Sequence, residues 1–217
     1  MVYVYYSRIS KRNHSLLVEE HLPHFPLDFQ NRLHRFKRWE DLQLSLLGRL
    51  LLERGIRELA GNTSNNFVEY TPYNKPRFST NDSIKFNISH SGEIATCAIT
   101  HHHEIGIDIE SIRPIILDDL ENSMSKREWE QIRASDNVLK MFYSFWTRKE
   151  AVVKAYGEGL SIPLTSFEVT GKEISYGNKT FTATNVNIAA GYMCSLALQY
   201  PPGSVVPPVA IRNVQFD

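Results

Sequence analysis

The sequence is poor in cysteine and has no long hydrophobic run. Of its 217 residues only Cys97 and Cys194 are cysteines, too few for a disulfide framework. Both stand in apolar runs, at 94–99 and 193–198, which predicts that they are buried and reduced. No apolar run reaches the roughly 18 residues that a membrane-spanning helix needs. The first residues also lack the basic and apolar segments of a signal peptide, so we expect a cytoplasmic protein.

The sequence also has no excess of charge of either sign. It contains 24 Lys and Arg residues against 24 Asp and Glu residues, so the formal net charge is zero. Without a positive excess the chain has no general attraction for nucleic acid or for an anionic membrane, and we expect neither as a partner. The patterns GxxxxGKS/T and GxGxxG and a Cys/His zinc spacing are absent from the sequence, so P-loop, Rossmann and zinc chemistry have no support.

The hydrophobic pattern that is present predicts an α+β chain. Apolar residues recur every four positions at Leu42, Leu46 and Leu50, which is typical of a helix, and Gly61 supplies a stop signal. Helices are predicted at 28–60, 126–135 and 138–156. Strands are predicted at 2–9, 67–70, 84–88, 94–100, 105–110, 167–170, 173–176, 181–186 and 192–198. Four prolines after residue 200 predict an irregular tail.

The same order of elements occurs twice along the chain. In each half a strand precedes helices and several further strands, and residues 92–99 are similar to residues 191–198, with glycine first in both. This repetition predicts two pseudo-symmetric α+β subdomains, 1–104 and 105–217, each with a strand, helices and a small, mostly antiparallel sheet. A cleft between two such halves is a favoured place for a functional site.

Two acidic residues of the predicted strand 105–110 are the first candidates for chemistry. Alternate residues of a strand point the same way, so Asp108 and Glu110 share one face while Ile107 and Ile109 share the other. Two carboxylates this close repel each other. A hard cation such as Mg²⁺, which binds carboxylates together with phosphate oxygens and water, relieves that repulsion. The alternative is a plain polar face on an edge strand.

Four other polar residues offer contacts for a phosphate. Glu150 and Lys154 stand four residues apart on a predicted helix, where they form either a surface ion pair or a carboxylate and an ammonium for phosphate chemistry. Ser89 and His90 end a predicted strand. Because neighbours in a strand point to opposite faces, they suit hydrogen bonds to a phosphate better than a Ser–His dyad. The alternative for this pair is a turn motif.

Two cationic segments and a histidine run complete the candidates. Arg32 begins a basic run whose helical spacing suits either a bound phosphate or a solvated helix face. Lys75 stands in an Asn-Lys-Pro turn, where a single lysine is usually solvated. The three histidines at 101–103 lie between two predicted strands, so we expect a solvated hairpin loop there rather than a metal site.

Each of these patterns is common, but their order and spacing along the chain are specific. Four segments matter most: Asn74-Lys75-Pro76, Asn87-Ile88-Ser89-His90-Ser91, Gly106-Ile107-Asp108-Ile109-Glu110, and Trp146-Thr147-Arg148-Lys149-Glu150-Ala151 with Lys154. In this order they resemble the 4′-phosphopantetheinyl transferases of the large, surfactin-synthetase-activating type. The resemblance runs from about residue 32 to residue 167.

This resemblance implies both a fold and a reaction. The fold is a pair of pseudo-symmetric α+β subdomains with coenzyme A bound in the cleft between them. In the implied reaction, which requires Mg²⁺, a serine hydroxyl of an apo acyl or peptidyl carrier protein attacks the β-phosphate of coenzyme A. Phosphopantetheine passes to the serine and 3′,5′-ADP leaves. A duplicated chain of this kind completes its site as a monomer.

The resemblance also implies roles for individual residues. Asp108, Glu110 and Glu150 would hold Mg²⁺. Glu150 would also be the general base that accepts the serine proton, and Lys154 would hold the pyrophosphate. The implied contacts with coenzyme A are Lys75, Ser89, His90, Arg32 and Lys154.

An apolar loop follows the acidic strand and is a candidate docking surface for the carrier protein. It comprises Ile112, Pro114, Ile115, Ile116 and Leu117. The loop is predicted either to meet an apolar helix face of the carrier protein or to belong to the core.

Two other functions compete with the transfer. One is a Mg²⁺-dependent phosphohydrolase, which would need no acceptor protein. The other is a module that binds coenzyme A or a carrier protein without turnover.

Overall fold

The computed structural model of the chain describes residues 1–61, 68–79, 83–159, 162–201 and 203–216. Its helices are α1 (His14–His21), α2 (Leu27–Leu33), α3 (Trp39–Ala60), α4 (Lys126–Arg133) and α5 (Val138–Tyr156). Its strands are β1 (Val2–Arg8), β2 (Val68–Tyr70), β3 (Pro76–Phe78), β4 (Ile84–Ser91), β5 (Ile94–His101), β6 (Ile105–Ser111), β7 (Glu173–Tyr176), β8 (Lys179–Asn185), β9 (Tyr192–Gln199) and β10 (Val209–Asn213).

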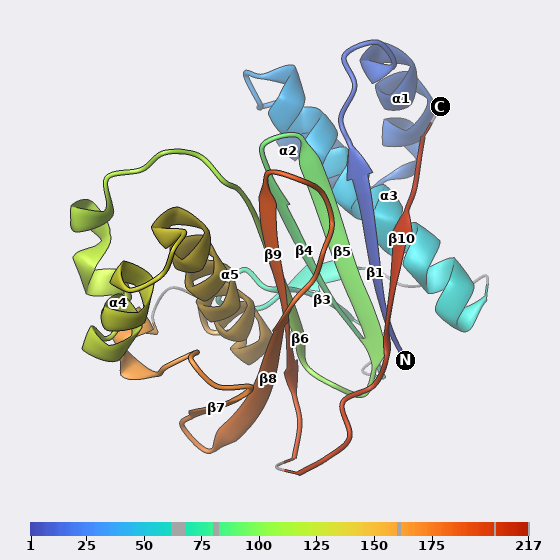
Figure 1. Cartoon of the computed structure of the whole chain (residues 1–217). Helices are drawn as coiled ribbons and strands as arrows, with labels where there is room; N and C mark the ends of the chain where they lie inside the picture. The colour runs from blue at the N-terminus through green and yellow to red at the C-terminus, as the bar shows by residue number, and fades with distance from the viewer. Residues whose placement is uncertain (62–67, 80–82, 160–161, 202, 217) are drawn as a thin grey trace.

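The strands form two four-stranded sheets and a small hairpin of β2 and β3 (Figure 1). The first sheet has the order β10-β1-β5-β4 and the second the order β6-β9-β8-β7. All neighbours within these sheets are antiparallel except β1 and β10. The predicted α+β class with a two-part architecture is therefore confirmed.

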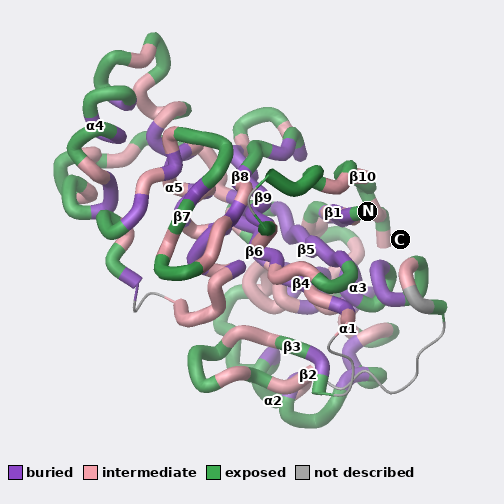
Figure 2. Tube along the Cα trace, turned by 90° about the horizontal axis from the view of Figure 1, so that it is seen from below, coloured by how far each residue is buried: buried purple, intermediate pink, exposed green. Residues whose placement is uncertain are grey.

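Three apolar cores hold the layers together. The first core packs α1, α2 and α3 against one face of the first sheet. The second packs α4 and α5 against the second sheet. The third core takes residues from β1, β5, β6 and β9, among them Val4, Ala98, Ile107 and Leu196, and so joins the two sheets. The strands that carry it are largely buried (Figure 2).

Most predicted elements are present, and α5 has the predicted bounds. The predicted helix 28–60 is two helices, since α2 ends at Leu33 and α3 begins at Trp39. Helix α1 occupies a stretch for which no element was predicted. The predicted strand 67–70 is represented by β2; residue 67 lies outside the described residues.

Two predictions about the C-terminal half are wrong. Residues 167–170 form no strand, because the N–H of Val169 donates to the Glu128 carboxylate at 2.8 Å instead of to a neighbouring strand. The tail is not irregular throughout, because β10 pairs in parallel with β1. Strand β10 is an exposed edge strand, so no alternation of buried and exposed side chains marks it in the sequence.

The division of the chain at residues 104 and 105 stays a proposal. Strand β10 comes from the C-terminal half of the sequence and completes the sheet of the N-terminal half (Figure 1). Cys97 and Cys194 are buried free thiols, as predicted. None of the helices in the described ranges combines the length and the apolar character needed to cross a bilayer.

Candidate active site

The site begins with the close approach of α5 to β6. A Cβ atom at Gly106 would lie 2.0 Å from the carbonyl oxygen of Ala151 and 2.5 Å from the backbone nitrogen of Ala155. Only glycine leaves room for a helix this close to the strand. The acidic face of β6 and the polar face of α5, which carries Glu150 and Lys154, are therefore brought together.

Lys154 is bound at the centre of this junction. Its Nζ atom lies 2.6 Å from Oδ1 of Asp108 and 3.0 Å from Oγ of Ser89. The Ser89 hydroxyl donates in turn to Asp108 Oδ1 at 3.1 Å. The Asp108 side chain is 5% exposed and that of Lys154 28% exposed. The cation therefore extends from solvent to a buried carboxylate, where electrostatic interactions are stronger than at the surface.

Two further carboxylates lie within electrostatic reach of this pair. Burial raises the pKa of Glu150, and Asp108 and Glu110 add to the rise, while Lys154 opposes it. Burial likewise raises the pKa of Glu110, against a hydrogen bond from Ser91 that lowers it. The nearby ammonium of Lys154 thus does not overcome the cost of keeping these two carboxylates charged. Such an acidic site favours an additional cation.

The donor set fits Mg²⁺, although the side chains are not gathered around one point. Oδ2 of Asp108 is buried without a hydrogen-bond partner, and carboxylate oxygens are the ligands that Mg²⁺ prefers. Within the described residues, however, no three His, Cys, Asp or Glu side chains are close enough together to hold an ion. In this arrangement Oδ1 of Asp108 is bound to Lys154. The chemistry fits, and binding an ion requires the carboxylates to converge.

A pocket of about 210 Å³ opens beside Lys154. Its lining includes Tyr73, Asn74, Lys75, Pro76, Lys154 and Gly157. Lys75 donates to Glu104 at 2.7 Å and to the carbonyl oxygen of Ala155 at 3.1 Å, which fixes it at the C-terminal end of α5. Burial lowers the pKa of Lys75, and Glu104 opposes that change. Two lysines therefore line the pocket, and cationic side chains of this kind suit an anionic ligand such as a diphosphate.

Ser89 and His90 lie at the rim of this junction on opposite faces of β4. Ser89 is 7% exposed and bonded to Asp108, whereas His90 is exposed, as the alternation of a strand predicts. Desolvation by the surrounding chain lowers the pKa of His90, and the Lys154 ammonium adds to the shift. His90 is therefore an exposed ring whose neutral form is favoured by its surroundings and by a nearby cation.

Arg32 lies on α2 and contacts Phe29 of the same helix and Tyr70 of the β2–β3 hairpin. Its guanidinium donates to the Tyr70 hydroxyl at 2.7 Å and stands over the rings of Phe29 and Tyr70, 5.1 and 5.3 Å from their centroids. These contacts do not bring Arg32 to the carboxylates of β6. Its predicted role at a phosphate stays a prediction.

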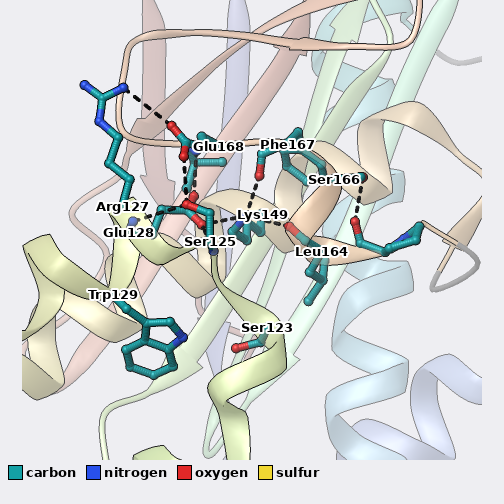
Figure 3. Close-up of polar contacts among 12 residues, drawn as sticks. Ser123, Ser125, Arg127, Glu128, Trp129, Lys149, Leu164, Ser166, Phe167 and Glu168 are labelled. Carbon is teal, nitrogen blue, oxygen red and sulfur yellow. Dashed lines mark hydrogen bonds and ion pairs between the residues drawn. The ribbon is translucent and has the colours of Figure 1, made fainter.

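Lys149, one residue before Glu150, is completely buried and points toward Glu128 and the loop at 164–167 (Figure 3). Its Nζ lies 2.9 Å from Oε2 of Glu128, and it donates to the carbonyl oxygens of Leu164 and Phe167, each at 2.6 Å. Glu128 also closes the capping box of α4 with Ser125. This network joins α4, α5 and the following loop, and so fixes the rotation of α5 about its axis.

Sequence analysis alone did not assign Lys149 this position. A signal was present, because Phe142, Phe145, Lys149 and Val152 follow helical spacing and all four are buried. A lysine within an apolar stripe indicates a buried partner. The partner itself, Glu128, lies 21 residues away and is not indicated by that spacing.

Comparisons with known proteins show the family to which the chain is related. A family model described as the 4′-phosphopantetheinyl transferase superfamily matches residues 104–197, and one described as the N-terminal part of 4′-phosphopantetheinyl transferase matches residues 18–102. The 4′-phosphopantetheinyl transferase gsp of Aneurinibacillus migulanus is 34% identical over 175 residues, which cover 76% of this chain and 73% of that protein.

Two other relatives are matched over shorter stretches. The 4′-phosphopantetheinyl transferase Sfp of Bacillus subtilis (strain 168) is 36% identical over 143 residues, 64% of this chain and 63% of that protein. The enzyme AcpT of Salmonella typhi, also named as a 4′-phosphopantetheinyl transferase, is 34% identical over 116 residues, 52% of this chain and 57% of that protein. The two family models together match most of the chain, and gsp is similar over about three quarters of it, so the chain belongs to the 4′-phosphopantetheinyl transferase superfamily as an enzyme of that class.

Proposed function

We propose that this enzyme transfers the 4′-phosphopantetheine arm of coenzyme A to a serine of an apo acyl or peptidyl carrier protein, in a Mg²⁺-dependent reaction that releases 3′,5′-ADP. One observation carries the proposal: Lys154 and the Asp108 carboxylate stand 2.6 Å apart beside a pocket that Lys75 also lines. Cations next to a buried carboxylate suit a diphosphate bound together with a divalent ion.

Asp108, Glu110 and Glu150 are the residues that would hold Mg²⁺. An ion held there would supply positive charge that offsets the charge of the diphosphate. Lys154 binds the same diphosphate and stabilises the negative charge that develops on the leaving phosphate. The unpartnered Oδ2 of Asp108 supports this assignment.

The transfer breaks one phosphoanhydride bond and forms one phosphoester bond. The serine oxygen of the carrier attacks the β-phosphorus, and the bond from that phosphorus to the bridging oxygen breaks, so that the leaving group is 3′,5′-ADP. The serine proton passes to the Glu150 carboxylate, directly or through a water. The raised pKa of Glu150 supports this role, since it makes the carboxylate a better proton acceptor.

The remaining predicted contacts anchor coenzyme A on the N-terminal half. Lys75 and Ser89 lie close to Lys154 and reach the diphosphate side of the ligand, while His90 and Arg32 meet its 3′-phosphate. Each half of the site comes from the same chain, which supports action as a monomer. The buried free thiols of Cys97 and Cys194 support a reducing, cytoplasmic location.

Intact-mass spectrometry of an apo carrier protein tests the proposal. We expect a serine-linked gain of one phosphopantetheine arm after incubation with the enzyme, coenzyme A and Mg²⁺. EDTA abolishes the gain, and so does Glu150→Ala. The matched control Glu173→Ala, which changes an exposed glutamate on β7, leaves it intact.

The other outcomes separate the competing functions. Release of phosphate or nucleotide without modified carrier would indicate a phosphohydrolase. Binding of coenzyme A without modification of fatty-acid, polyketide or nonribosomal-peptide carriers would indicate a module without turnover. Undiminished transfer by Glu150→Ala would remove Glu150 from the catalytic set.

A further inference from the structure

The two sheets meet at their edge strands, β4 and β6 (Figures 1 and 2). An edge strand leaves every second N–H without a partner in its own sheet. On β6, side chains of β4 supply the missing acceptors. The N–H of Ile107 donates to Asn87 Oδ1 at 2.9 Å, that of Ile109 to Ser89 Oγ at 3.4 Å, and that of Ser111 to Ser91 Oγ at 3.1 Å.

These three bonds form a ladder with constant register. Asn87, Ser89 and Ser91 alternate along β4, and each acceptor precedes its donor by 20 residues. Strands β4 and β6 therefore run in parallel and are joined by side-chain oxygens instead of carbonyl groups. We refer to Asn87, Ser89 and Ser91 as the polar ladder.

Both serines of the polar ladder also bond to a carboxylate on β6. Ser89 Oγ donates to Asp108 Oδ1 at 3.1 Å, and Ser91 Oγ donates to Glu110 Oε2 at 2.7 Å. A hydroxyl has one proton and rotates to suit its partners. Because each serine oxygen already accepts a hydrogen bond from a backbone N–H of β6, the hydroxyl proton of that serine donates to the carboxylate. A hydrogen bond to a charged oxygen is also stronger than a neutral one.

We propose that the polar ladder orients the carboxylates that bind the divalent cation, and that Ser91 is a positioning residue for Glu110. The inference deepens the proposed function and rests on it for the identity of the ion. Ser91 is the informative member, since its bonds go to Glu110 and to the backbone of β6. Ser89, by contrast, also contacts Lys154 and belongs to the site itself.

Binding of Mn²⁺, measured by electron paramagnetic resonance, tests the proposal without turnover. Mn²⁺ accepts the same oxygen ligands as Mg²⁺. Ser91→Ala is expected to weaken binding about 10-fold, the lower end of the range for residues that support metal ligands. Ser91→Thr keeps the hydroxyl and is expected to restore binding to the wild-type level. Ser175→Ala, the same change at an exposed position of β7, leaves it unaltered.

A double-variant cycle separates positioning of Glu110 from general weakening of the fold. If Ser91 acts through Glu110, Ser91→Ala causes no further loss in a Glu110→Gln background. An equal loss in both backgrounds overturns the proposal, and so does wild-type Mn²⁺ affinity in Ser91→Ala. If Ser91→Ala fails to fold, Ser91→Cys, whose thiol is a weak donor, replaces it in the same comparison.

A further variant separates this proposal from the proposed function. Asp108→Ala is expected to abolish Mn²⁺ binding. If wild-type protein binds no Mn²⁺, or if binding survives Asp108→Ala, the metal assignment fails and the ladder proposal falls with it. If Asp108→Ala abolishes binding and Ser91→Ala does not weaken it, the ladder proposal alone is overturned.

Discussion

At the scale of single residues, His90 is expected to make binding of coenzyme A depend on pH. Desolvation and Lys154 lower the pKa of His90, so the ring is neutral at pH 7 in the free protein. A bound phosphate stabilises the imidazolium form, so affinity rises as the pH falls toward the pKa of the free ring and declines as the pH rises. His90→Ala should remove the part of the pH dependence that comes from this ring.

Isothermal titration of coenzyme A between about pH 5 and 8 checks this prediction. The affinity of the wild-type protein divided by that of His90→Ala should increase as the pH falls. Protonation of the ligand's own phosphates affects both proteins and cancels in the ratio. A ratio that does not change with pH would remove His90 from the phosphate contacts.

Ile116 is expected to contact the carrier protein. Its side chain is 70% exposed, whereas Ile112, Ile115 and Leu117 pack against the second core. The core alternative therefore holds for these three residues, and docking by Ile116 stays a prediction. Ile116→Asp should raise KM for the carrier about 10-fold, equivalent to about 1.4 kcal/mol, because it replaces an apolar contact by a solvated charge. KM for coenzyme A should not change.

Steady-state kinetics, with each substrate varied in turn, measure the KM for the carrier and the KM for coenzyme A separately. Val205→Asp is a matched control, since Val205 is 89% exposed and lies in the segment that precedes β10. An unchanged KM for the carrier in folded Ile116→Asp would exclude docking by this residue.

The sequence indicates which candidate residues share a face of a strand or helix, but it does not indicate the residues that support them. Asp108 and Glu110 share a face because of strand periodicity, and Glu150 and Lys154 share one because of helix periodicity; both are properties of local sequence. Ser91 is different, because its role depends on a partner that lies 20 residues away on another sheet. Pairing between elements has no local pattern, so the polar ladder was not predicted.

At the scale of elements, Gly106 determines how closely α5 approaches β6. Gly106→Ala would place a methyl group 2.0 Å from a helix carbonyl oxygen, so helix and strand must separate. We expect a loss of about 1–3 kcal/mol in the free energy of unfolding, together with loss of transfer activity. Gly171→Ala is the control, because its added carbon would lie 3.5 Å from the nearest atom.

Urea unfolding and the mass-spectrometric transfer assay together check Gly106→Ala. Wild-type stability and activity in this variant would show that the spacing of α5 and β6 does not depend on the glycine.

The buried pair of Lys149 and Glu128 gives a second prediction for α5. Lys149→Met leaves a buried carboxylate without its cation, which should cost about 3–5 kcal/mol. Adding Glu128→Gln removes that charge while keeping an acceptor for the N–H of Val169. The double variant should therefore be more stable than Lys149→Met alone.

Urea denaturation of both single variants and the double variant measures this coupling. Lys140→Met, at an exposed position of the same helix, should stay within about 0.5 kcal/mol of wild type. Additive losses from the two substitutions would contradict a coupled buried pair.

Local periodicity also explains which elements were predictable. Helix α5 was predicted with its observed bounds because its apolar stripe runs along its whole length and Gly157 ends it with a positive φ of 95°. Helix α1 was not predicted, since it buries only Leu17. Strand β10 is stabilised by backbone pairing with β1, which leaves no trace in the pattern of its side chains.

At the scale of the whole molecule, the two halves share structure that neither completes alone. The repeated order of elements predicted two parts, and the structure joins them by the third core and the polar ladder. Strand β10 adds a third connection, because it returns from the C-terminal half to the first sheet. The carboxylates and the polar ladder lie on opposite sides of this junction. Separation of the two halves would therefore disrupt the active site as well.

The halves are therefore expected to unfold together. Trp39 reports on the N-terminal half, and Trp129 and Trp146 report on the C-terminal half. In Trp39→Phe, fluorescence reports on the C-terminal half alone, and in Trp129→Phe/Trp146→Phe it reports on the N-terminal half alone. In each variant the urea midpoint measured by fluorescence should equal the midpoint measured by circular dichroism. Ile107→Ala, which opens a cavity in the third core, should lower both midpoints together, at a cost of about 2–5 kcal/mol. Different midpoints for the two halves would mean that each half is stable by itself, and so would an effect of Ile107→Ala on the C-terminal tryptophans alone. The junction would then hold the two parts of the active site together without stabilising either half.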